Sequence, residues 1–352
     1  MTCDAVGGVW QYANDLARGL ASEGAEVVLA VLGPGALPIE VVAGVTVVDT
    51  RLPLDWLASG PDQVLAAGRA LAALATRHRA DLVHLNSPTL AAADPFPAPV
   101  VTVAHGCVGT WFAALSEAPS DDLAWHEELV RKGLHAADAI AAPSASYAAL
   151  LQRHYGLQAL PKVIFNGRSP AAGDSHDGGD HVLTAGRLWD RAKNTSLLDE
   201  VAALLPVPLR AAGPTTGPRG DAIAPEHLQL LGTLSEGALF AEYAQALIFV
   251  SAARFEPFGL AVLEAAQAGC PLVLSGIDTF RELWTGAALL VPDNDPAAYA
   301  AAIERIRIDP ALRAHLSDAA RLRASRYSVE AMTAGTLELY GTVLARPQAR
   351  AA

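Results

Sequence analysis

Short, almost continuously apolar runs alternate with helical patterns along the whole chain of 352 residues. Runs of four to eight apolar residues bounded by turn signals are typical of strands whose two faces are both covered by helices. We expect such strands at residues 26–32, 41–48, 82–85, 100–104, 182–185, 209–212, 228–231, 246–251 and 288–291. The alternation predicts an α/β protein built on doubly wound parallel sheets.

The chain is longer than a single hydrophobic core usually supports, which predicts two domains. A polar, glycine-rich segment without periodicity follows Pro170 and reads as a linker. We therefore expect an N-terminal Rossmann-like domain over residues 1–168, a linker over 169–180 and a C-terminal Rossmann-like domain over 181–327. A last helix is expected over residues 328–346.

Composition excludes several classes of protein. Hydrophobic residues make up 52% of the chain and charged residues 18%, which is typical of a globular protein. The net charge of −12 argues against nucleic acid as a partner and gives no strong signal for an anionic membrane. The first residues lack the pattern of a signal peptide, and no apolar run reaches the ~18 residues of a membrane span. The three cysteines lie far apart without metal-ligand spacing. Together these features favour a cytoplasmic protein with reduced thiols.

One strand, loop and helix are predicted between residues 246 and 271. Pro257 suits the first turn of a helix, and Gly269 followed by Pro271 suits its end. A helix N-terminus leaves N–H groups unpaired and carries partial positive charge, so it attracts anions. We expect the N–H groups of Phe258, Gly259 and Leu260 to face an anion.

Two carboxylates frame this predicted anion site. Glu256 precedes the helix, and Glu264 is expected roughly two turns inside it with alanines as helix neighbours. Each also has an ordinary explanation. Glu264 could be a helix-favouring surface residue, and Glu256 could be a first-turn acid that the helix dipole favours.

Two cations lie around another strand-to-helix turn. Arg187 and Lys193 follow the strand at 182–185, and the helix that opens at Lys193-Asn194 comes next. A single cation at such a turn is commonly a surface charge. Two of them at the carboxyl edge of a sheet, in an acidic protein, are better explained by a diphosphate ligand.

The first half contains two further candidates. Gly7 and Gly8 open a helix predicted over residues 9–22, and a glycine pair allows close approach of a phosphate, although glycine pairs also serve as plain turns. His105 directly follows the strand at 100–104, where ligands bind in open α/β sheets. The loop expected next, at residues 107–115, contains Trp111 and Phe112, which could pack in the core.

Taken together, these motifs resemble those of a known enzyme family. The chain carries G-G, H-G, G-R-L-x4-K-N and E-P-F-G-L-x-x-x-E in that order, and the combination is similar to the retaining GT-B glycosyltransferases of glycosyltransferase family 4 (glycosyl transferases group 1). The resemblance covers nearly the whole chain. It implies two Rossmann-like domains that face each other across a cleft, with the terminal helix crossing back to the first domain.

The resemblance also implies residue roles. Glu256 would contact the donor sugar, Glu264 would hold the ribose hydroxyls, and His105 would lie beside the sugar. The N-terminal domain would be the acceptor side, with residues 107–115 as an acceptor-side loop, and the C-terminal domain would bind the nucleotide sugar. Arg187, Lys193 and the helix N-terminus would bind the diphosphate. The implied donor-binding set is Gly7, Gly8, Arg187, Lys193, Leu234, Glu256, Phe258, Gly259, Leu260 and Glu264, and the implied catalytic set is His105, Arg187, Lys193 and Glu256.

The expected function is a metal-independent, retaining transfer of a sugar from a UDP- or GDP-linked donor to a hydroxyl acceptor. No cofactor is expected, and Asp293-Asn-Asp295 is read as a helix start rather than a metal motif. Three alternatives stay open. They are a sugar-nucleotide epimerase, a polymerase similar to glucan synthases, and a non-catalytic sugar-nucleotide-binding protein. The last is favoured only by a first strand shortened to residues 1–3.

Overall fold

The structure is a computed structural model and divides the chain into two compact units. It describes residues 1–5, 7–33, 43–93, 95–118, 123–169, 178–292 and 294–346. Unit 1 comprises Met1–Gly167 and the chain from Val329 onward, and unit 2 comprises Arg168–Ser328. Most of the predicted linker, residues 170–177, lies outside the described residues.

Unit 1 is built on parallel strands in two sheets, with the orders β1-β2-β3 and β4-β5-β6-β7. Its strands are β1 (Thr2–Asp4), β2 (Val27–Leu32), β3 (Val45–Asp49), β4 (Val83–Leu85), β5 (Val100–Val103), β6 (Ala139–Ala142) and β7 (Lys162–Val163). Its α-helices are α1 (Gly8–Ser22), α2 (Pro61–Arg77), α3 (Val108–Leu115), α4 (Ala124–Ala136), α5 (Ala145–Tyr155) and α12 (Val329–Leu344).

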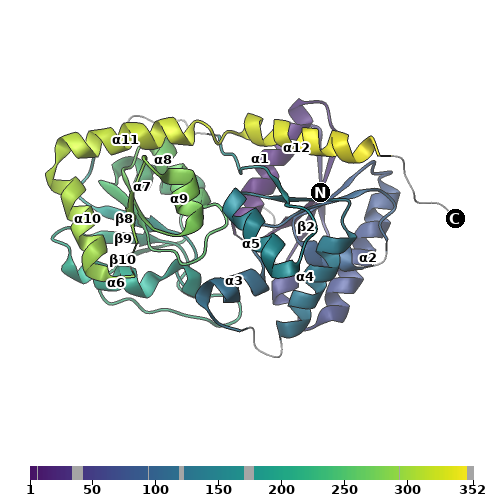
Figure 1. The fold of residues 1–352 in the computed structure, drawn as a ribbon, viewed down its shortest axis with the longest axis horizontal. Coiled ribbons are helices and arrows are strands. Elements are labelled where there is room, and N and C mark those ends of the chain that lie inside the picture. Colours follow the sequence, from purple (N-terminus) through teal and green to yellow (C-terminus); the bar gives the residue numbers. More distant parts are fainter. Residues whose placement is uncertain are drawn as a thin grey trace. The chain divides into compact units, whose positions relative to one another are not determined.

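Both faces of strands β2, β4 and β5 in unit 1 are largely buried, as the apolar runs predict, whereas β3 is partly exposed. Along β2, Leu29 and Val31 pack with residues of α1 and α12, whereas Ala30 and Leu32 pack with residues of α2 and α4. Figure 1 shows α12, coloured yellow, running beside α1. The alternation follows from the two-residue period of a strand, which sends successive side chains to opposite faces.

Hydrogen bonds from Asn86 connect the two sheets of unit 1. Asn86 lies just after β4, and its N–H donates to Thr2 Oγ1 at 2.8 Å while its Nδ2 donates to the Thr2 carbonyl at 2.7 Å. These bonds hold the end of β4 beside β1. From β1 the chain moves outward through β2 and β3, and from β4 it moves outward through β5, β6 and β7. With β1 beside β4, this is the strand order of a doubly wound sheet.

Unit 2 contains a single parallel sheet with the order β10-β9-β8-β11-β12-β13. Its strands are β8 (Val182–Ala185), β9 (Leu209–Ala212), β10 (Gln229–Gly232), β11 (Ile248–Ser251), β12 (Leu272–Ser275) and β13 (Leu289–Val291). Its α-helices are α6 (Thr195–Leu204), α7 (Glu236–Gln245), α8 (Leu260–Ala268), α9 (Asp278–Trp284), α10 (Pro296–Ile308) and α11 (Pro310–Ala324).

Helices also cover both faces of the unit 2 sheet. Leu183 and Phe249 belong to a core cluster with residues of α7, α8, α9 and α11, whereas Val182 and Ile248 belong to a cluster with residues of α6 and α10. The positions of these helices around the sheet can be followed in Figure 1. The predicted fold class, two Rossmann-like α/β domains, is confirmed.

Two predicted elements are wrong in detail. Helix α8 begins at Leu260 rather than at Pro257, because Gly259 adopts a φ of 96° and separates the loop from the helix. Glu264 therefore lies about one turn inside the helix rather than two. Residues 108–115 form helix α3 instead of a loop.

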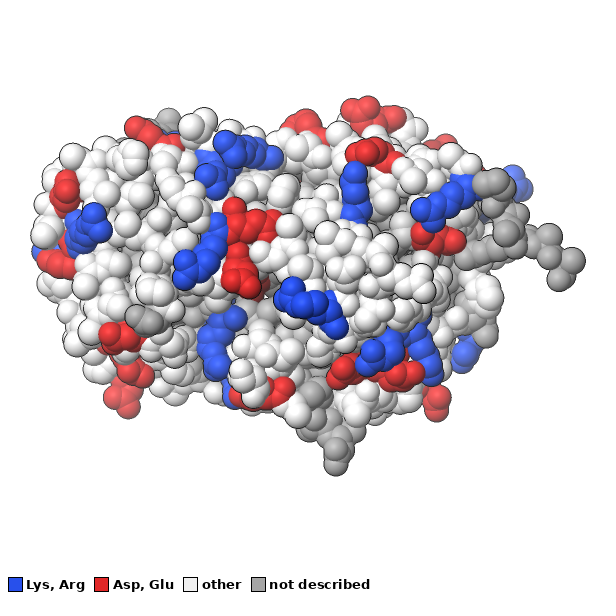
Figure 2. All heavy atoms as spheres, viewed as in Figure 1, with Lys and Arg blue, Asp and Glu red and all other residues white. Residues whose placement is uncertain are grey.

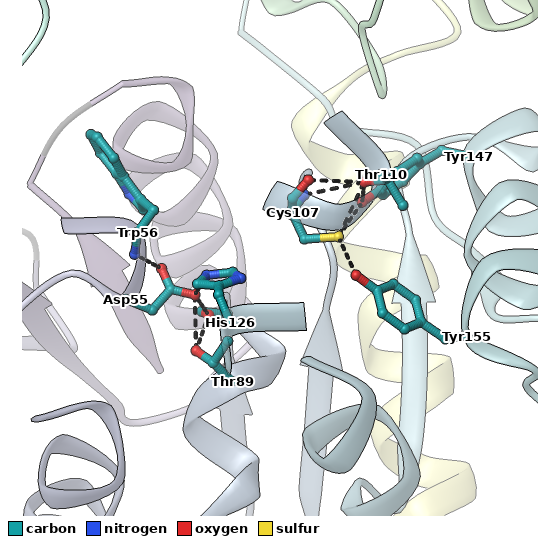
Figure 3. A network of polar contacts seen from close by, with 9 residues as sticks. Asp55, Trp56, Thr89, Cys107, Thr110, His126, Tyr147 and Tyr155 are labelled. Atoms are coloured by element: carbon teal, nitrogen blue, oxygen red, sulfur yellow. Dashed lines mark hydrogen bonds and ion pairs between the residues drawn. The ribbon is translucent and has the colours of Figure 1, made fainter. Parts of the chain in front are cut away.

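A buried carboxylate organises part of unit 1, as Figure 3 shows. Asp55 Oδ2 accepts hydrogen bonds from the hydroxyls of Ser87 and Thr89 at 2.6 and 2.8 Å, and it lies 3.1 Å from His126 Nε2. Its Oδ1 accepts from the N–H of Trp56 at 2.7 Å. Burial alone would raise the pKa of Asp55, but His126 and the two hydroxyls outweigh it and lower the pKa to about 2.

A second polar group drawn in Figure 3 surrounds Cys107. The thiol lies 3.1 Å from the hydroxyls of Thr110 and of Tyr155. All three cysteines are buried and unoxidised.

We predict that Asp55→Asn lowers the free energy of unfolding at pH 7 by roughly 2 kcal/mol. The folded-state pKa lies below the ordinary value of 3.8, so the ionised carboxylate contributes stability that is complete above about pH 4. That contribution is lost as the pH falls toward about 2. Urea unfolding of wild type and variant between pH 7 and pH 2.5 measures the difference.

The matched control is Asp49→Asn, because Asp49 forms an exposed ion pair with Arg51 and also accepts from the exposed N–H of Arg51. The control is expected to change stability very little at any pH. An Asp55→Asn variant as stable as wild type at pH 7 contradicts the assigned network.

Candidate active site

The strand order of unit 2 reverses between β8 and β11. From β8 the chain moves outward through β9 and β10, and from β11 it moves outward through β12 and β13 on the other side. The loops after β8 and β11 therefore leave the same sheet edge side by side and diverge, which creates the position where open α/β sheets bind ligands. Arg187 and Lys193 lie in the first loop, and Glu256 lies in the second.

Lys193 and Glu256 meet at this edge. Lys193 Nζ donates to Glu256 Oε2, and the exposed fractions of the two side chains are 24% and 16%. Lys193 ends a 3₁₀ turn, Arg191–Lys193, and Asn194 next to it adopts a φ of 57°. The pair joins residues 63 positions apart in sequence, so only the fold brings them together.

Arg187 is held by an acid that sequence analysis did not single out. Its Nη2 donates to Asp190 Oδ2 at 2.7 Å, and its guanidinium lies 5.5 Å from the ring centre of Trp189. Asp190 also accepts from the N–H of Ala192 at 3.0 Å and caps the 3₁₀ turn. Asp190 thus fixes both the cation and the turn that carries Lys193. The sequence feature that could have predicted this pair is the acidic residue three positions after Arg187.

The start of α8 lies against Glu256. A Cβ placed on Gly259 would come within 3.3 Å of Glu256 Cγ and 3.1 Å of Phe280, and the φ of 96° disfavours any side chain. Because Gly259 is the N-cap of the helix and the N–H of Leu263 donates to its carbonyl, the N–H groups of Gly259, Leu260, Ala261 and Val262 have no partner within the helix. The expectation that the N–H groups of Phe258, Gly259 and Leu260 face an anion stays a prediction. Phe258 is buried in the core cluster and only precedes the helix.

Glu264 is a buried carboxylate with polar partners rather than the apolar surroundings that its alanine neighbours predicted. Its Oε1 lies 3.1 Å from Arg168 Nε, and its Oε2 accepts from the Tyr243 hydroxyl at 3.3 Å. Burial raises the pKa of Glu264, and the positive charge of Arg168 and the hydrogen bond from Tyr243 act in the opposite direction. A buried carboxylate needs such partners.

Arg168 connects Glu264 of α8 to the neighbouring helix α7. Its Nη2 also forms an ion pair with Glu236 Oε1 at 2.6 Å, in the first turn of α7, and its side chain is 4% exposed. The Arg168 carbonyl accepts from Gln267 Nε2 on α8 at 2.9 Å. Sequence analysis missed Arg168 because its partners are distant in the chain, and nothing local marks it.

The unit 1 candidates lie after strands at the corresponding sheet edge. Gly7 precedes α1 with a φ of 86°, and no side chain caps the helix there, so the backbone N–H groups of its first turn have no side-chain acceptor at the N-cap. Gly8 is the first residue of α1. His105 follows β5 and is half-buried. Burial lowers the pKa of His105 to about 3, so its imidazole is neutral at neutral pH.

Leu234 lies in the loop between β10 and α7 and is half-buried. Trp111 and Phe112 of α3 pack against each other edge to face, with ring centroids 4.9 Å apart. They are also half-buried.

In the described part of the chain, no three His, Cys, Asp or Glu residues are grouped so that they could hold a metal ion. Asp295 caps α10 by accepting from Ala297 N at 3.0 Å, while Asp293 lies outside the described residues. No described helix has the length and apolar character needed to cross a bilayer. Basic and acidic side chains are interspersed on the face shown in Figure 2.

Two curated proteins are similar over almost the whole chain. The D-inositol 3-phosphate glycosyltransferase of Streptomyces bingchenggensis is 28% identical over 96% of this chain and 85% of its own. The glycogen synthase of Mycobacterium tuberculosis is 28% identical over 95% of this chain and 91% of its own.

Solved structures of glycosyltransferases share the fold. The sucrose-phosphate synthase of Thermosynechococcus elongatus superposes with a TM-score of 0.81 at 21% identity, covering 98% of this chain and 96% of the other. Anabaena HepE in complex with UDP-glucose gives a TM-score of 0.73 at 17% identity, covering 97% and 98%. These neighbours have the GT-B fold, which is therefore the fold of this chain.

Family models match both halves of the sequence. The model "Glycosyltransferase Family 4" matches residues 6–171, and the model "Glycosyl transferases group 1" matches residues 179–309. The first match ends within the predicted linker, and the second covers the strands, loops and helix that carry Arg187, Lys193, Glu256 and Glu264. The chain belongs to the family 4, group 1 glycosyltransferases.

Proposed function

We propose that the chain transfers a sugar from a nucleotide diphosphate sugar to a hydroxyl acceptor, with retention of anomeric configuration and without a metal ion. The observation that supports this most strongly is the meeting of Lys193 and Glu256 at the strand reversal of unit 2, beside the start of α8. A diphosphate needs fixed positive groups, and a sugar needs carboxylate acceptors for its hydroxyls. Lys193 supplies a positive group and Glu256 supplies a carboxylate, and the two are in contact at this edge of the sheet.

The main barrier is the departure of the diphosphate from an oxocarbenium-like sugar. Negative charge grows on the leaving oxygen, so fixed cations and helix N–H groups stabilise the transition state more than the bound donor. Lys193 has three N–H donors and Arg187 has five, and their pairs with Glu256 and Asp190 use only part of that capacity. Each can therefore bind a phosphate oxygen while keeping its protein partner.

Glu264 is proposed to accept hydrogen bonds from the ribose hydroxyls. A carboxylate has about four lone-pair sites, and Arg168 and Tyr243 occupy two of them. Because Arg168 and Tyr243 hold the carboxylate on both oxygens, it is oriented before the nucleotide binds. Such pre-orientation reduces the entropy lost on binding.

The remaining chemistry is assigned to the substrates and to His105. We propose that the leaving phosphate takes the proton of the acceptor hydroxyl, which requires the acceptor to attack from the face that the phosphate leaves. That geometry retains the anomeric configuration. His105 is proposed to contact a hydroxyl of the donor sugar.

The choice of substrates is guided by the relatives. Anabaena HepE has been solved with UDP and with UDP-glucose, so UDP-sugars are the first donors to test and GDP-sugars the second. The similar proteins are named for inositol 3-phosphate and for glycogen, which are different acceptors. We therefore propose only a hydroxyl compound as acceptor.

The direct test starts with a thermal-shift screen of UDP- and GDP-sugars, because a ligand of the native state raises the melting temperature. Donors that bind are then incubated with hydroxyl acceptors, and release of the nucleoside diphosphate is measured. The anomeric configuration of the product is read by NMR. Conversion of the donor sugar without acceptor would indicate an epimerase, and binding without any turnover would indicate a non-catalytic protein.

We predict that Lys193→Met lowers kcat by roughly 10²–10³-fold, the loss typical of one group that stabilises transition-state charge. The matched control is Lys162→Met, which removes another lysine paired with a glutamate, Glu338, in unit 1. Steady-state kinetics should show the loss only for Lys193. Equal kcat values for the two variants would rule out the assigned role.

We predict that Glu264→Gln weakens binding of the nucleoside diphosphate by roughly 10–100-fold, since hydrogen bonds to a charged group contribute about 1.5–3 kcal/mol. Calorimetric titration measures the dissociation constant. Glu236→Gln is the control, because it removes the other carboxylate paired with Arg168 and leaves Glu264 in place. Similar weakening in both variants would show that disturbance of Arg168, and not loss of a ribose ligand, is responsible.

We predict that the rate of transfer does not change after prolonged dialysis against EDTA, nor on addition of Mg²⁺ or Mn²⁺. In this proposal Arg187, Lys193 and the first N–H groups of α8 neutralise the diphosphate charge. A rate that falls by tenfold or more with EDTA and returns with a divalent cation contradicts this part of the proposal.

A further inference from the structure

Asn86 of unit 1 lies between two histidines at the carboxyl ends of neighbouring strands. It follows β4, whereas His84 lies within β4 and His105 follows the adjacent β5. The Oδ1 atom of Asn86 lies 3.0 Å from Nε2 of His84 and 3.0 Å from Nε2 of His105. One side-chain oxygen is thus shared by two imidazoles.

The orientation of the Asn86 amide follows from its other contacts. One of the two terminal atoms of the Asn86 side chain lies 2.7 Å from the carbonyl oxygen of Thr2. Because a carbonyl oxygen can only accept a hydrogen bond, this terminal atom is the donor Nδ2. The atom that faces the two histidines is then the oxygen, which can only accept. Each histidine must therefore carry a proton on Nε2.

The second nitrogen of His84 agrees with this assignment. Its Nδ1 lies 2.6 Å from the hydroxyl of Tyr340 on α12, and a tyrosine hydroxyl donates readily to an unprotonated ring nitrogen. Burial lowers the pKa of His84 and of His105 to about 3, which keeps both rings neutral at neutral pH. A neutral ring with its proton on Nε2 has a lone pair on Nδ1.

We propose that Asn86 is a positioning residue that fixes His105 as the neutral Nε2–H tautomer, so that His105 Nδ1 accepts a hydrogen bond from a hydroxyl of the donor sugar. This inference rests on the proposed function, since it names the atom of His105 that meets the sugar. The ring of Tyr12 packs edge to face against His105 with centroids 4.3 Å apart and holds the imidazole plane. Tautomer and plane are then both set before the sugar arrives.

The opposite tautomer would place an N–H on Nδ1. That atom would donate to the sugar hydroxyl, and the hydroxyl would lose its acceptor. A carboxylate in place of the Asn86 amide would also accept from both rings, but its charge would favour their protonation. The amide therefore selects one tautomer without adding charge to the site.

The first experiment observes the tautomer directly, independently of activity. In protein labelled with ¹⁵N-histidine, protonated and unprotonated ring nitrogens of a neutral imidazole resonate far apart, and the His105 signals are identified by their loss in His105→Gln. We expect wild-type His105 to have its proton on Nε2 at pH 7. A proton on Nδ1, or on both nitrogens, overturns the proposal.

The second experiment uses Asn86→Leu, which keeps the approximate shape of the side chain and removes the acceptor. We expect the His105 signals to show a mixture of tautomers, and kcat/KM for the donor to fall by about three- to tenfold, the factor of one neutral hydrogen bond. Thr102→Val is the matched control, because it removes a buried side-chain hydrogen bond, 3.2 Å to the Leu85 carbonyl, from the same pair of strands. The control should leave the His105 signals unchanged.

A set of monodeoxy donor analogues links the tautomer to the sugar. One analogue should lower wild-type kcat/KM by the same factor as Asn86→Leu, and the variant should lose little more with that analogue. Fully additive losses for every analogue overturn the link to the sugar. An absence of any transfer by wild type, with the tautomer as expected, would instead overturn the proposed function.

Discussion

The arrangement of the candidate site depends on one topological constraint, the reversal of strand order between β8 and β11. Parallel strands that wind outward in opposite directions leave their two innermost loops side by side without a helix between them. The loop after β8 brings Lys193, and the loop after β11 brings Glu256, so their ion pair is a direct consequence of the reversal. Unit 1 has the same feature where Asn86 joins the end of β4 to β1.

A second feature of the structure is that its buried carboxylates each have polar or charged partners. Asp55, Asp190 and Glu264 are each largely buried, and each is held by cationic or hydroxyl partners from other parts of the chain. Such pairing is what a buried carboxylate requires, because an unpaired one would lose its hydration without compensation. These partners fix the positions of Asp190 and Glu264 in the candidate site. Charged groups held in fixed positions can stabilise a transition state in which charge develops.

The fold could be predicted well from the sequence because its strands are short and apolar. The predicted strands at 182–185 and 209–212 coincide with β8 and β9, since burial on both faces leaves a continuous apolar signal. Local backbone geometry was harder to predict. The start of α8 was placed three residues early because Pro257 fits a first turn, whereas the left-handed conformation of Gly259 decides the boundary.

The contacts between residues that lie far apart in the sequence could not be predicted. Arg168 and Tyr243 meet Glu264 only after α7, α8 and the start of unit 2 have packed, and no periodic pattern links them. Asn86 likewise acquires its place between His84 and His105 only when β4 and β5 pair. The motif residues were therefore recognisable in sequence, while the residues that orient them were not.

The proposed diphosphate site consists of Arg187, Lys193 and the first N–H groups of α8. Calorimetric titration of the protein with uridine, UMP and UDP, and with the matching guanosine series, tests it most directly. We expect affinity to rise with each phosphate in the preferred series, and the gain to shrink as salt is added, because the added interactions are between charges. A nucleoside that binds as tightly as its diphosphate, at low and at high salt, would rule out this diphosphate site.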